Sequence, residues 1–217
     1  MKQLVKKIKL TSTMTALTGL HIGGSKDSVE IGGVDLPVIK MATKSGQPYV
    51  PGSSLKGKMR CLLEQVNGAT RVGQSAAVNN LFGYLGDKQQ PSKPSKIIVR
   101  DAYLTPKSVQ LLKSCSDLDM PFTENKYENS IDRIKGVAAN GSLRQIERVP
   151  AGVEFKVEII INVWEDDDAD GLLELLYQGI SLLKNDYLGG SGSRGYGQVS
   201  FSPFTKTELS SANNWKE

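Results

Sequence analysis

The chain has 217 residues, enough for one large domain or two small ones, and for a substantial core without disulfide or metal support. Its formal net charge of +4 is a mild basic bias, compatible with a nucleic-acid partner but not proof of one. No segment reaches the roughly 18 apolar residues of a membrane span, and the N-terminus lacks a signal-peptide core. We therefore expect a cytoplasmic protein that does not bind membranes.

The histidine and cysteine content narrows the chemistry further. His21 is the only histidine, which excludes a metal site with several histidines and a ribonuclease mechanism with two. Cys61 and Cys115 have no metal-ligand spacing. We expect them to be buried thiols in a reducing compartment.

The apolar periodicity predicts the main elements in chain order. They are a strand over 5–18, a helix over 55–66 with Ser53 as N-cap, a short helix over 75–82, a strand over 97–104, a helix from Thr105-Pro106, a strand over 155–163, a helix from Asp166 to Lys184 and a strand over 199–204. The polar tail from Thr205 is expected to fray.

This order is strand–helix–strand followed by strand–helix–strand, the ferredoxin-like arrangement that the RNA-recognition motif also has. It predicts an α+β fold with a single domain over 1–204 and a polar tail over 205–217. Two long insertions interrupt the pattern, near 19–52 and 117–150. The second is rich in charged residues and amides, and is either a hairpin or an ordered loop.

A glycine-rich run over 187–197 carries five glycines and Arg194. Glycine permits positive φ and close backbone approach, so N–H groups in such a loop can converge on an anion while arginine offers a five-donor fork. This pattern predicts a phosphate-binding loop. A flexible Gly/Ser linker is the alternative.

A second candidate is the turn into the helix that follows Pro51. Two serines and three cations lie within it, where a helix N-terminus offers free N–H groups to phosphate; they are Ser53, Ser54, Lys56, Lys58 and Arg60. A capped helix with solvated cations is the alternative. The run from Gly52 to Lys58 also fits the start of a P-loop, although Met59 stands where a magnesium-binding hydroxyl belongs.

Two further residues could carry chemistry. Asp35 lies between glycines and Pro37, where a carboxylate could hold Mg²⁺ or accept a proton from a ribose 2′-hydroxyl; it could equally be an Asx-turn residue. His21, between glycines at a strand end, could contact a base or phosphate, or be a satisfied loop histidine. The charged residues of 117–150 form either a solvated face or an arm that reaches RNA or a neighbouring subunit.

These stretches occur together in an order that resembles one known family. The motifs are Gly19–Gly24, Gly33–Ile39, Tyr49–Arg60, Ile98–Ala102, Glu128–Arg133, Glu147–Gly152 and Gly189–Gly197. Together they resemble the repeated backbone subunit of type III-A (Csm) CRISPR effector complexes, in the RAMP superfamily. The resemblance covers residues 5 to about 204.

The resemblance implies a modified RNA-recognition-motif core with a lid and a thumb-like hairpin, the latter at 117–150. It implies a filament of copies along a guide crRNA, other Csm subunits, and cleavage of single-stranded target RNA at regular intervals with a divalent metal, Mg²⁺ or Mn²⁺. The family's essential aspartate falls on Asp35, which could also bind the metal.

The same match assigns guide contacts and support for the cleavage site. The guide contacts are His21, Ser53, Ser54, Lys56, Lys58, Arg60, Gly190, Ser191, Ser193, Arg194 and Gly195. The thumb or cleavage-site support residues are Asp101, Glu124, Glu128 and Arg133. The alternatives are a non-catalytic RNA-binding scaffold of the same superfamily and, more remotely, a P-loop-like nucleotide-binding enzyme.

Overall fold

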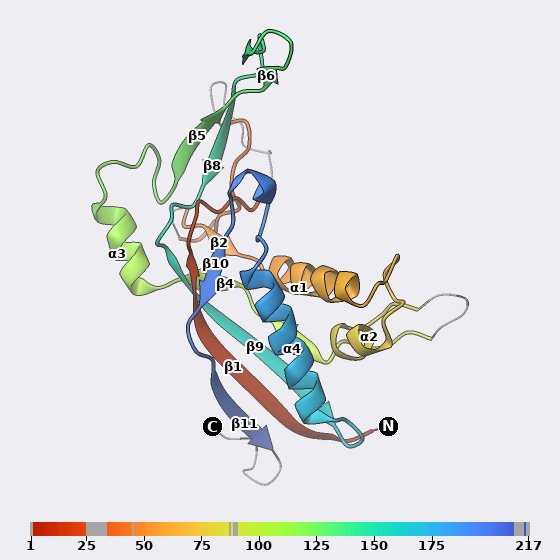
Figure 1. Ribbon diagram of the computed structural model, residues 1–217. Helices are drawn as coiled ribbons and strands as arrows, with labels where there is room; N and C mark the ends of the chain where they lie inside the picture. The colour runs from red at the N-terminus through yellow and green to blue at the C-terminus, as the bar shows by residue number, and fades with distance from the viewer. Residues whose placement is uncertain are drawn as a thin grey trace.

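The protein pairs one large antiparallel sheet with helices and a long protruding hairpin (Figure 1). The structure, a computed structural model, describes residues 2–24, 34–44, 46–86, 88, 91–210 and 215. The strands are β1 Leu4–Ala16, β2 Tyr49–Val50, β3 Ile97–Val99, β4 Ala102–Leu104, β5 Glu124–Glu128, β6 Ile131–Asp132, β7 Val137–Ala138, β8 Arg144–Arg148, β9 Glu154–Trp164, β10 Val199–Phe201 and β11 Thr205–Ser210. The helices are α1 Gly52–Val66, α2 Ala76–Phe82, α3 Pro106–Ser114, α4 Ala169–Lys184 and the 3₁₀ turn η1 Gly192–Arg194.

The two longest strands, β1 and β9, form the centre of the sheet. They pair antiparallel from Leu4 opposite Trp164 to Thr15 opposite Glu154, with a register shift near Leu4. Alternate side chains point to opposite faces of a strand, so Ile8, Leu10 and Met14 are buried while their neighbours face outward. The strand order is β10-β1-β9-β4-β2, with β11 also paired to β1 and β3 to β9. This confirms both long strands predicted from the sequence.

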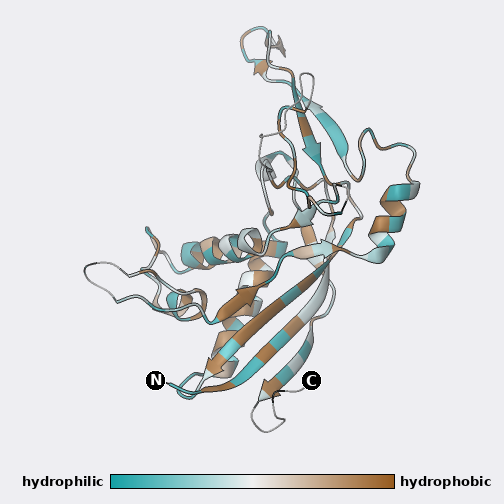
Figure 2. Cartoon of the chain, turned by 180° about the vertical axis from the view of Figure 1, so that it is seen from behind, coloured by the Kyte–Doolittle hydropathy of each residue, from teal (hydrophilic) through white to brown (hydrophobic). Residues whose placement is uncertain are grey.

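The helices α1 and α4 pack on one face of this sheet, and in the described part of the chain no helix layer covers most of the other face of β1 and β9 (Figures 1 and 2). Apolar residues at helical spacing place Leu55, Met59 and Leu63 of α1 in the core. Gly179 of α4 lies against Leu63, so the two helices approach closely there. One contiguous core therefore lies between the sheet and this helix layer.

The strand predicted over 97–104 is interrupted in the middle. Val99 pairs with Ile159 and Tyr103 with Lys156, so three residues of this chain segment oppose two of β9, which is the pattern of a β-bulge. At the bulge, the Oδ1 atom of Asp101 accepts a hydrogen bond of 2.8 Å from the N–H of Gly52, the first residue of α1. The bulge thus supplies a carboxylate to the helix N-terminus, where negative charge is favourable.

This arrangement corrects two expectations about the start of α1. The N-cap is Pro51, which makes no side-chain cap, and the first N–H of α1 is instead bonded by Asp101 from the bulge, so the prediction of Ser53 as N-cap is wrong. The Gly52–Lys58 segment lies wholly inside α1 rather than in a loop before it. It therefore cannot wrap phosphates as a P-loop does, and the P-loop alternative is wrong.

The other helices begin within three residues of the predicted starts. Ser75 caps α2, Thr105 caps α3 with Pro106 at its first position, and Asp168 caps α4, each by accepting a backbone N–H. The positive φ of Gly83 ends α2, as expected.

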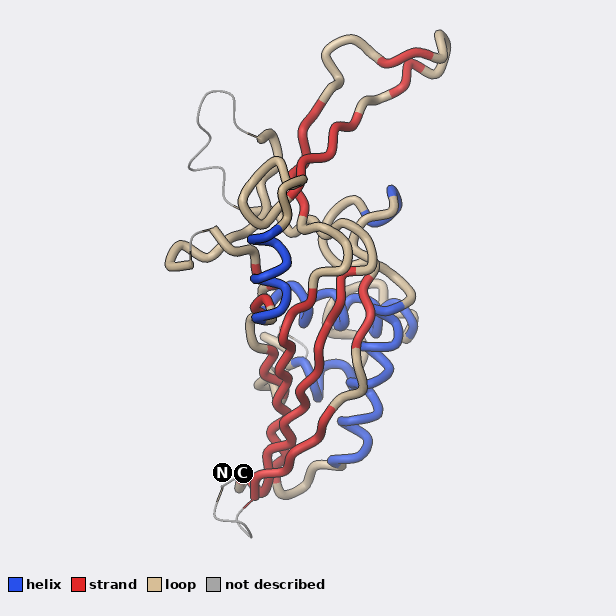
Figure 3. The backbone as a smooth tube through the Cα atoms, turned by 90° about the vertical axis from the view of Figure 1, so that its left-hand side faces the viewer, coloured by secondary structure: helices blue, strands red, loops and turns tan. Residues whose placement is uncertain are grey.

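The insertion at 117–150 contains a hairpin, which was one of the two predicted alternatives, the other being an ordered loop. β5 pairs with β8 from Glu124 opposite Arg148 to Glu128 opposite Arg144, and β6 pairs with β7 at the tip. Figure 3 shows this arm extending away from the sheet and helices. We call residues 124–148 the thumb hairpin.

Two smaller expectations are wrong. Both Cys61 and Cys115 are free and exposed rather than buried. The segment from Thr205 does not fray at once, because β11 pairs with β1 from Thr205 to Ser210. Among the described residues, no helix is long and apolar enough to cross a membrane.

Candidate functional site: the junction at the base of the thumb

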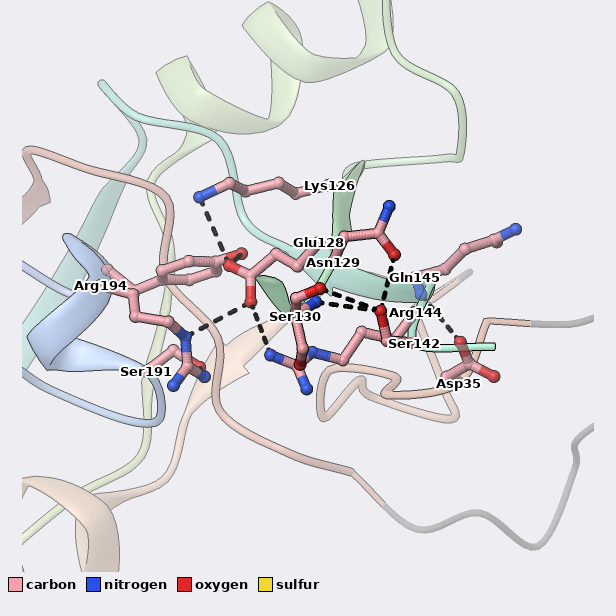
Figure 4. Close-up of polar contacts among 11 residues, drawn as sticks. Asp35, Lys126, Glu128, Asn129, Ser130, Ser142, Arg144, Gln145, Ser191 and Arg194 are labelled. Atoms are coloured by element: carbon pink, nitrogen blue, oxygen red, sulfur yellow. Dashed lines mark hydrogen bonds and ion pairs between the residues drawn. The ribbon is translucent and has the colours of Figure 1, made fainter. Parts of the chain in front are cut away.

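Asp35 lies beside the base of the thumb hairpin. Its segment runs alongside β8, where the Leu36 N–H donates to the carbonyl of Gln145 and the Glu147 N–H donates to the carbonyl of Leu36. The Asp35 side chain is exposed, and its Oδ2 accepts a hydrogen bond of 2.8 Å from the Gln145 N–H (Figure 4). This is not an Asx turn, because the donor is 110 residues away. The carboxylate is oriented by the thumb and open to solvent.

Glu147 holds that segment in place from the interior. Its side chain is buried and accepts hydrogen bonds from the Val38 N–H at 2.9 Å and the Thr123 hydroxyl at 2.5 Å, with the Lys40 ammonium at 2.5 Å. A buried carboxylate is stable only when it is paired and hydrogen-bonded, and Glu147 has both. It therefore ties the segment that carries Asp35 to the thumb base.

His21 belongs to the same junction. It is buried, and its Nδ1 lies 2.7 Å from the carbonyl oxygen of Glu147. A carbonyl can only accept, so Nδ1 carries the proton and donates. The His21 carbonyl in turn accepts the Gly190 N–H. His21 is thus a satisfied histidine that links the thumb to the glycine-rich loop; a contact with RNA stays a prediction.

The glycine-rich loop is an ordered structure, so the linker alternative is wrong. Gly189, Gly195 and Gly197 adopt positive φ, and Ser191 has φ 61°. At Gly192 a Cβ would fall 1.9 Å from the Tyr187 ring, so only glycine fits there. The N–H groups of Gly190, Arg194, Gly195 and Gly197 already bond to backbone carbonyls. A backbone nest could use only the other N–H groups of the loop.

Four groups converge on the carboxylate of Glu128 (Figure 4). The Tyr196 hydroxyl donates to it at 2.8 Å, Arg194 lies at 3.3 Å, Lys126 at 3.4 Å and Arg144 at 3.5 Å. We call these five residues the Glu128 cluster. It joins the thumb, through β5 and β8, to the glycine-rich loop.

The cluster shifts the pKa of both acids in it. Burial raises the pKa of Glu128, but hydrogen bonds from Tyr196 and Lys126 and the charges of Lys126 and Arg194 outweigh it, so the pKa is lowered. Burial, followed by the hydrogen bond and charge of Glu128, raises the pKa of Tyr196 to about 12. At neutral pH Glu128 is therefore ionised and Tyr196 remains a donor.

The three cations predicted at the start of α1 have different partners. Lys58 pairs with Asp186 at 3.0 Å and lies 3.6 Å above the Tyr187 ring, next to the glycine-rich loop. Lys56 instead donates to Ser95 at 2.7 Å, and burial together with Arg60 lowers its pKa. Arg60 pairs with Glu64 at 3.0 Å.

The serines of the α1 start and the remaining predicted site residues are more dispersed. Ser53 is exposed and Ser54 half-buried on the first turn of α1. Asp101 lies at the same helix start, bound to Gly52. Glu124 pairs with Arg148 at 2.6 Å within the thumb base. Arg133 is exposed in the turn at the thumb tip.

The structure also gives a role in the site to residues that the sequence left unassigned within the charged insertion and the glycine-rich run. Glu147, Lys126, Arg144 and Tyr196 are central to the junction. Charge alone could not select the first three, because they stand in a run of mixed charges. Tyr196 had a weak signal, as an aromatic residue between glycines.

The described residues include no group of three or more His, Cys, Asp or Glu side chains placed to hold a metal ion. Asp35 offers one exposed carboxylate. Mg²⁺ often binds through one or two carboxylates, with waters and substrate phosphates completing its shell. The site therefore fits a metal that RNA would help to hold, and does not fit a preformed protein cage.

Comparison with known proteins shows the family to which this chain belongs. The model of the RAMP superfamily matches residues 13–200. A protein of Methanocaldococcus jannaschii named CRISPR system Cms endoribonuclease Csm3 is 40% identical over 205 residues, covering 90% of this chain and 78% of the relative. The Streptococcus thermophilus protein of the same name is 39% identical over 213 residues, covering 94% and 90%.

A solved structure agrees with these relatives. It is a crystal structure of a Csm3–Csm4 subcomplex in the type III-A CRISPR-Cas interference complex, with a TM-score of 0.59 and 29% identity, covering 96% of this chain and 90% of the other. The chain belongs to the RAMP superfamily and, within it, to the Csm3 family.

Proposed function

We propose that the chain is a backbone subunit of a type III-A CRISPR interference complex that binds guide RNA and cleaves single-stranded target RNA at regular intervals. The observation that carries the cleavage is Asp35, an exposed carboxylate fixed by Gln145 beside the thumb base. Membership of a family whose members are named endoribonucleases supports it. Copies of the chain along the guide, and contacts with other Csm subunits, are part of the same proposal.

The core is proposed to be a modified ferredoxin-like fold of the RNA-recognition type. Taking β3 and β4 as one bulged strand, the chain runs β1, α1, β3/β4, β9, α4, β10, and the sheet order is β10-β1-β9-β4. This is the strand order that two interleaved βαβ units produce. The thumb hairpin and the segment before β2, the proposed lid, are then insertions at one end of that core.

Guide binding is assigned to the glycine-rich loop and the start of α1. Arg194 is half exposed on the loop. Lys58 lies next to the loop, where it pairs with Asp186 and lies above the Tyr187 ring. In this reading the protein contacts RNA backbone and leaves sequence recognition to base pairing, as in other RNA-guided systems. His21, Ser53, Ser54, Lys56 and Arg60 remain proposed contacts.

The chemistry of cleavage follows from the position of Asp35. A target nucleotide that the thumb displaces from pairing with the guide could bring its 2′-oxygen in line with the neighbouring phosphorus. Asp35 would accept the 2′-hydroxyl proton as the 2′-oxygen–phosphorus bond forms and the bond to the 5′-oxygen breaks. The products are a 2′,3′-cyclic phosphate and a 5′-hydroxyl, and the 5′-oxygen takes a proton from water.

A divalent ion, Mg²⁺ or Mn²⁺, is proposed to bind Asp35 together with RNA phosphate oxygens. Such an ion would neutralise part of the charge that develops on the cleaved phosphate. Asp35 serves either as its ligand or as the proton acceptor, and the Gln145 N–H fixes the carboxylate in both cases.

The test compares Asp35→Asn with wild type in the reconstituted complex, with Mg²⁺ and with EDTA. Asparagine keeps an oxygen for the Gln145 N–H and removes the charge, so the local backbone should not change. We expect target cleavage to fall by about 10²- to 10⁴-fold. EDTA should abolish cleavage by the wild type, and target binding should persist in the variant.

Asp170→Asn, at an exposed position of α4, is the matched control and should cleave normally. Regular cuts that persist in Asp35→Asn would show that Asp35 does not carry the cleavage. The nuclease would then have to be another residue or another subunit.

A further inference from the structure

The Glu128 cluster carries more positive charge than its own acid neutralises. Three cations face one carboxylate, which leaves an excess of two positive charges in a partly buried junction. The next pair out, Glu124 with Arg148, is already balanced. Such an excess of positive charge at a partly exposed junction attracts an anion.

The cations are held loosely, and they face outward. Charge-assisted hydrogen bonds are usually 2.7–2.9 Å long, whereas the three cation contacts to Glu128 are 3.3, 3.4 and 3.5 Å. The side chains of Lys126, Arg144 and Arg194 remain 36%, 40% and 51% exposed. Among the described residues, only Tyr196 makes a short bond to the carboxylate, at 2.8 Å. Glu128 thus collects the cations without using their full donor capacity.

One of these donors has no partner. The Nε atom of Arg144 is buried and makes no hydrogen bond within the described part of the chain. A buried N–H without an acceptor costs about 1–3 kcal/mol, so such a group points to an acceptor that arrives with a ligand. Its neighbour Arg194 is partly fixed already, because its Nη2 donates to the Ser191 hydroxyl at 2.6 Å.

We infer that Lys126, Arg144 and Arg194 form one binding site for a single RNA phosphate, shared between the thumb base and the glycine-rich loop. Two guanidinium groups match the oxygens of a phosphodiester, and lysine adds a point charge. Glu128 is the positioning residue that keeps the three cations together, and Tyr196 anchors Glu128. This inference rests on the proposed RNA binding and adds two thumb residues to it.

The position of this site has a consequence for the thumb. Arg144 and Lys126 lie on β8 and β5, whereas Arg194 follows from α4 through the glycine-rich loop. A phosphate bound by all three would fix the thumb relative to the loop. β8 carries both Arg144 and Gln145, and the Gln145 N–H binds Asp35. RNA bound by Arg144 would therefore also fix the strand that orients Asp35.

The test is a double-mutant cycle on RNA binding. Binding of a labelled single-stranded RNA to the complete chain is measured over a range of salt concentrations for wild type, Arg144→Gln, Arg194→Gln and the double variant. We expect each single change to weaken binding about tenfold and to lower the salt slope by about 0.7. If both arginines serve one phosphate, the double variant should lose clearly less than the product of the two single effects.

Lys113→Gln, on the last turn of α3, is the charge-matched control and should bind as wild type. Lys126→Gln should behave as Arg144→Gln does. Thermal unfolding and circular dichroism separate loss of binding from loss of folding. If Arg144→Gln or Arg194→Gln does not fold, Arg144→Lys or Arg194→Lys is measured instead.

The outcomes separate the inference from the proposed function. If wild type binds RNA with a steep salt dependence and Arg144→Gln leaves it unchanged, the shared phosphate site is wrong and RNA binding stands. Independent, multiplicative losses would mean separate phosphates and would also overturn it. If wild type does not bind RNA at all, the proposed function fails first.

Discussion

At the scale of single residues, the site depends on carboxylates that have different tasks. Asp35 is exposed and oriented by one backbone N–H, Glu147 is buried and holds backbone and lysine together, and Glu128 is the counter-ion of three cations. Exposure therefore separates the candidate for chemistry from the two acids that organise the site. A carboxylate that reacts with RNA must remain accessible, whereas one that positions others is better paired and buried.

The lowered pKa of Glu128 makes a prediction about stability and pH. A carboxyl whose pKa is lower in the folded state stabilises the fold above its ordinary pKa of 4.5, and this contribution disappears as the pH falls through the lowered value. We expect Glu128→Gln to unfold more easily than wild type at pH 7, and the difference to shrink as the pH falls below about 4.

Urea unfolding of the two proteins at pH 7, 5, 4 and 3 measures this difference. Glu174→Gln, at an exposed position of α4, is the control and should show no such trend. A Glu128→Gln difference that stays constant from pH 7 to pH 3 would mean that the charge of Glu128 does not stabilise the fold.

Much of the site could not be found from local sequence, because its contacts join distant segments. Asp35 is 110 residues from Gln145, and Glu128 is 68 from Tyr196. The glycine-rich run pointed to Arg194, whereas Asp35 was selected by the resemblance to a known family, because its own neighbours left an Asx turn equally open. It could not show that Glu147, one acid among many in a mixed-charge run, becomes the buried one.

At the scale of elements, the helices and long strands followed their periodicity, and the errors arose where tertiary contacts replace local ones. Ser53 has the residue type of an N-cap, but the chain enters α1 through Pro51, and Asp101 from the bulge takes over the bond. The bulge itself could be suspected only from Arg100 interrupting an apolar run. A cysteine on a helical pattern predicts burial, yet Cys61 lies on the exposed side of α1.

Because Asp101 takes the place of a serine cap, we expect effects of different size for two substitutions. Asp101→Ala removes the acceptor of the Gly52 N–H, so we expect the free energy of unfolding to fall by about 1 kcal/mol, as for other lost helix caps. Ser53→Ala should change it by less than about 0.5 kcal/mol, because that exposed side chain caps nothing. Chemical denaturation of the RNA-free chain distinguishes the two; a larger loss for Ser53→Ala would restore serine as the cap.

At the scale of the whole molecule, the chain separates a rigid support from a projecting arm. The core lies between the sheet and α1 and α4, while the thumb hairpin extends beyond it from one end (Figures 1 and 3). Between them lies the junction in which the Asp35 segment, the thumb base and the glycine-rich loop are bonded together. RNA bound at this junction would contact both parts at once.

The tip of the thumb is apolar and open to solvent, which is unusual for a surface with no role. Ile131, Ile134 and Val137 are 68%, 96% and 57% exposed. Because they bury little surface in the chain alone, replacing all three with serine should leave the unfolding midpoint within about 2 °C of wild type. If the thumb separates guide and target bases, the same variant should cleave target RNA more slowly while Asp35 and the Glu128 cluster remain in place. Thermal unfolding and cleavage by the reconstituted complex, measured side by side, test both parts. Normal cleavage at normal intervals would remove the apolar tip from RNA handling, whereas a large fall in the unfolding midpoint would show that the tip packs on the fold.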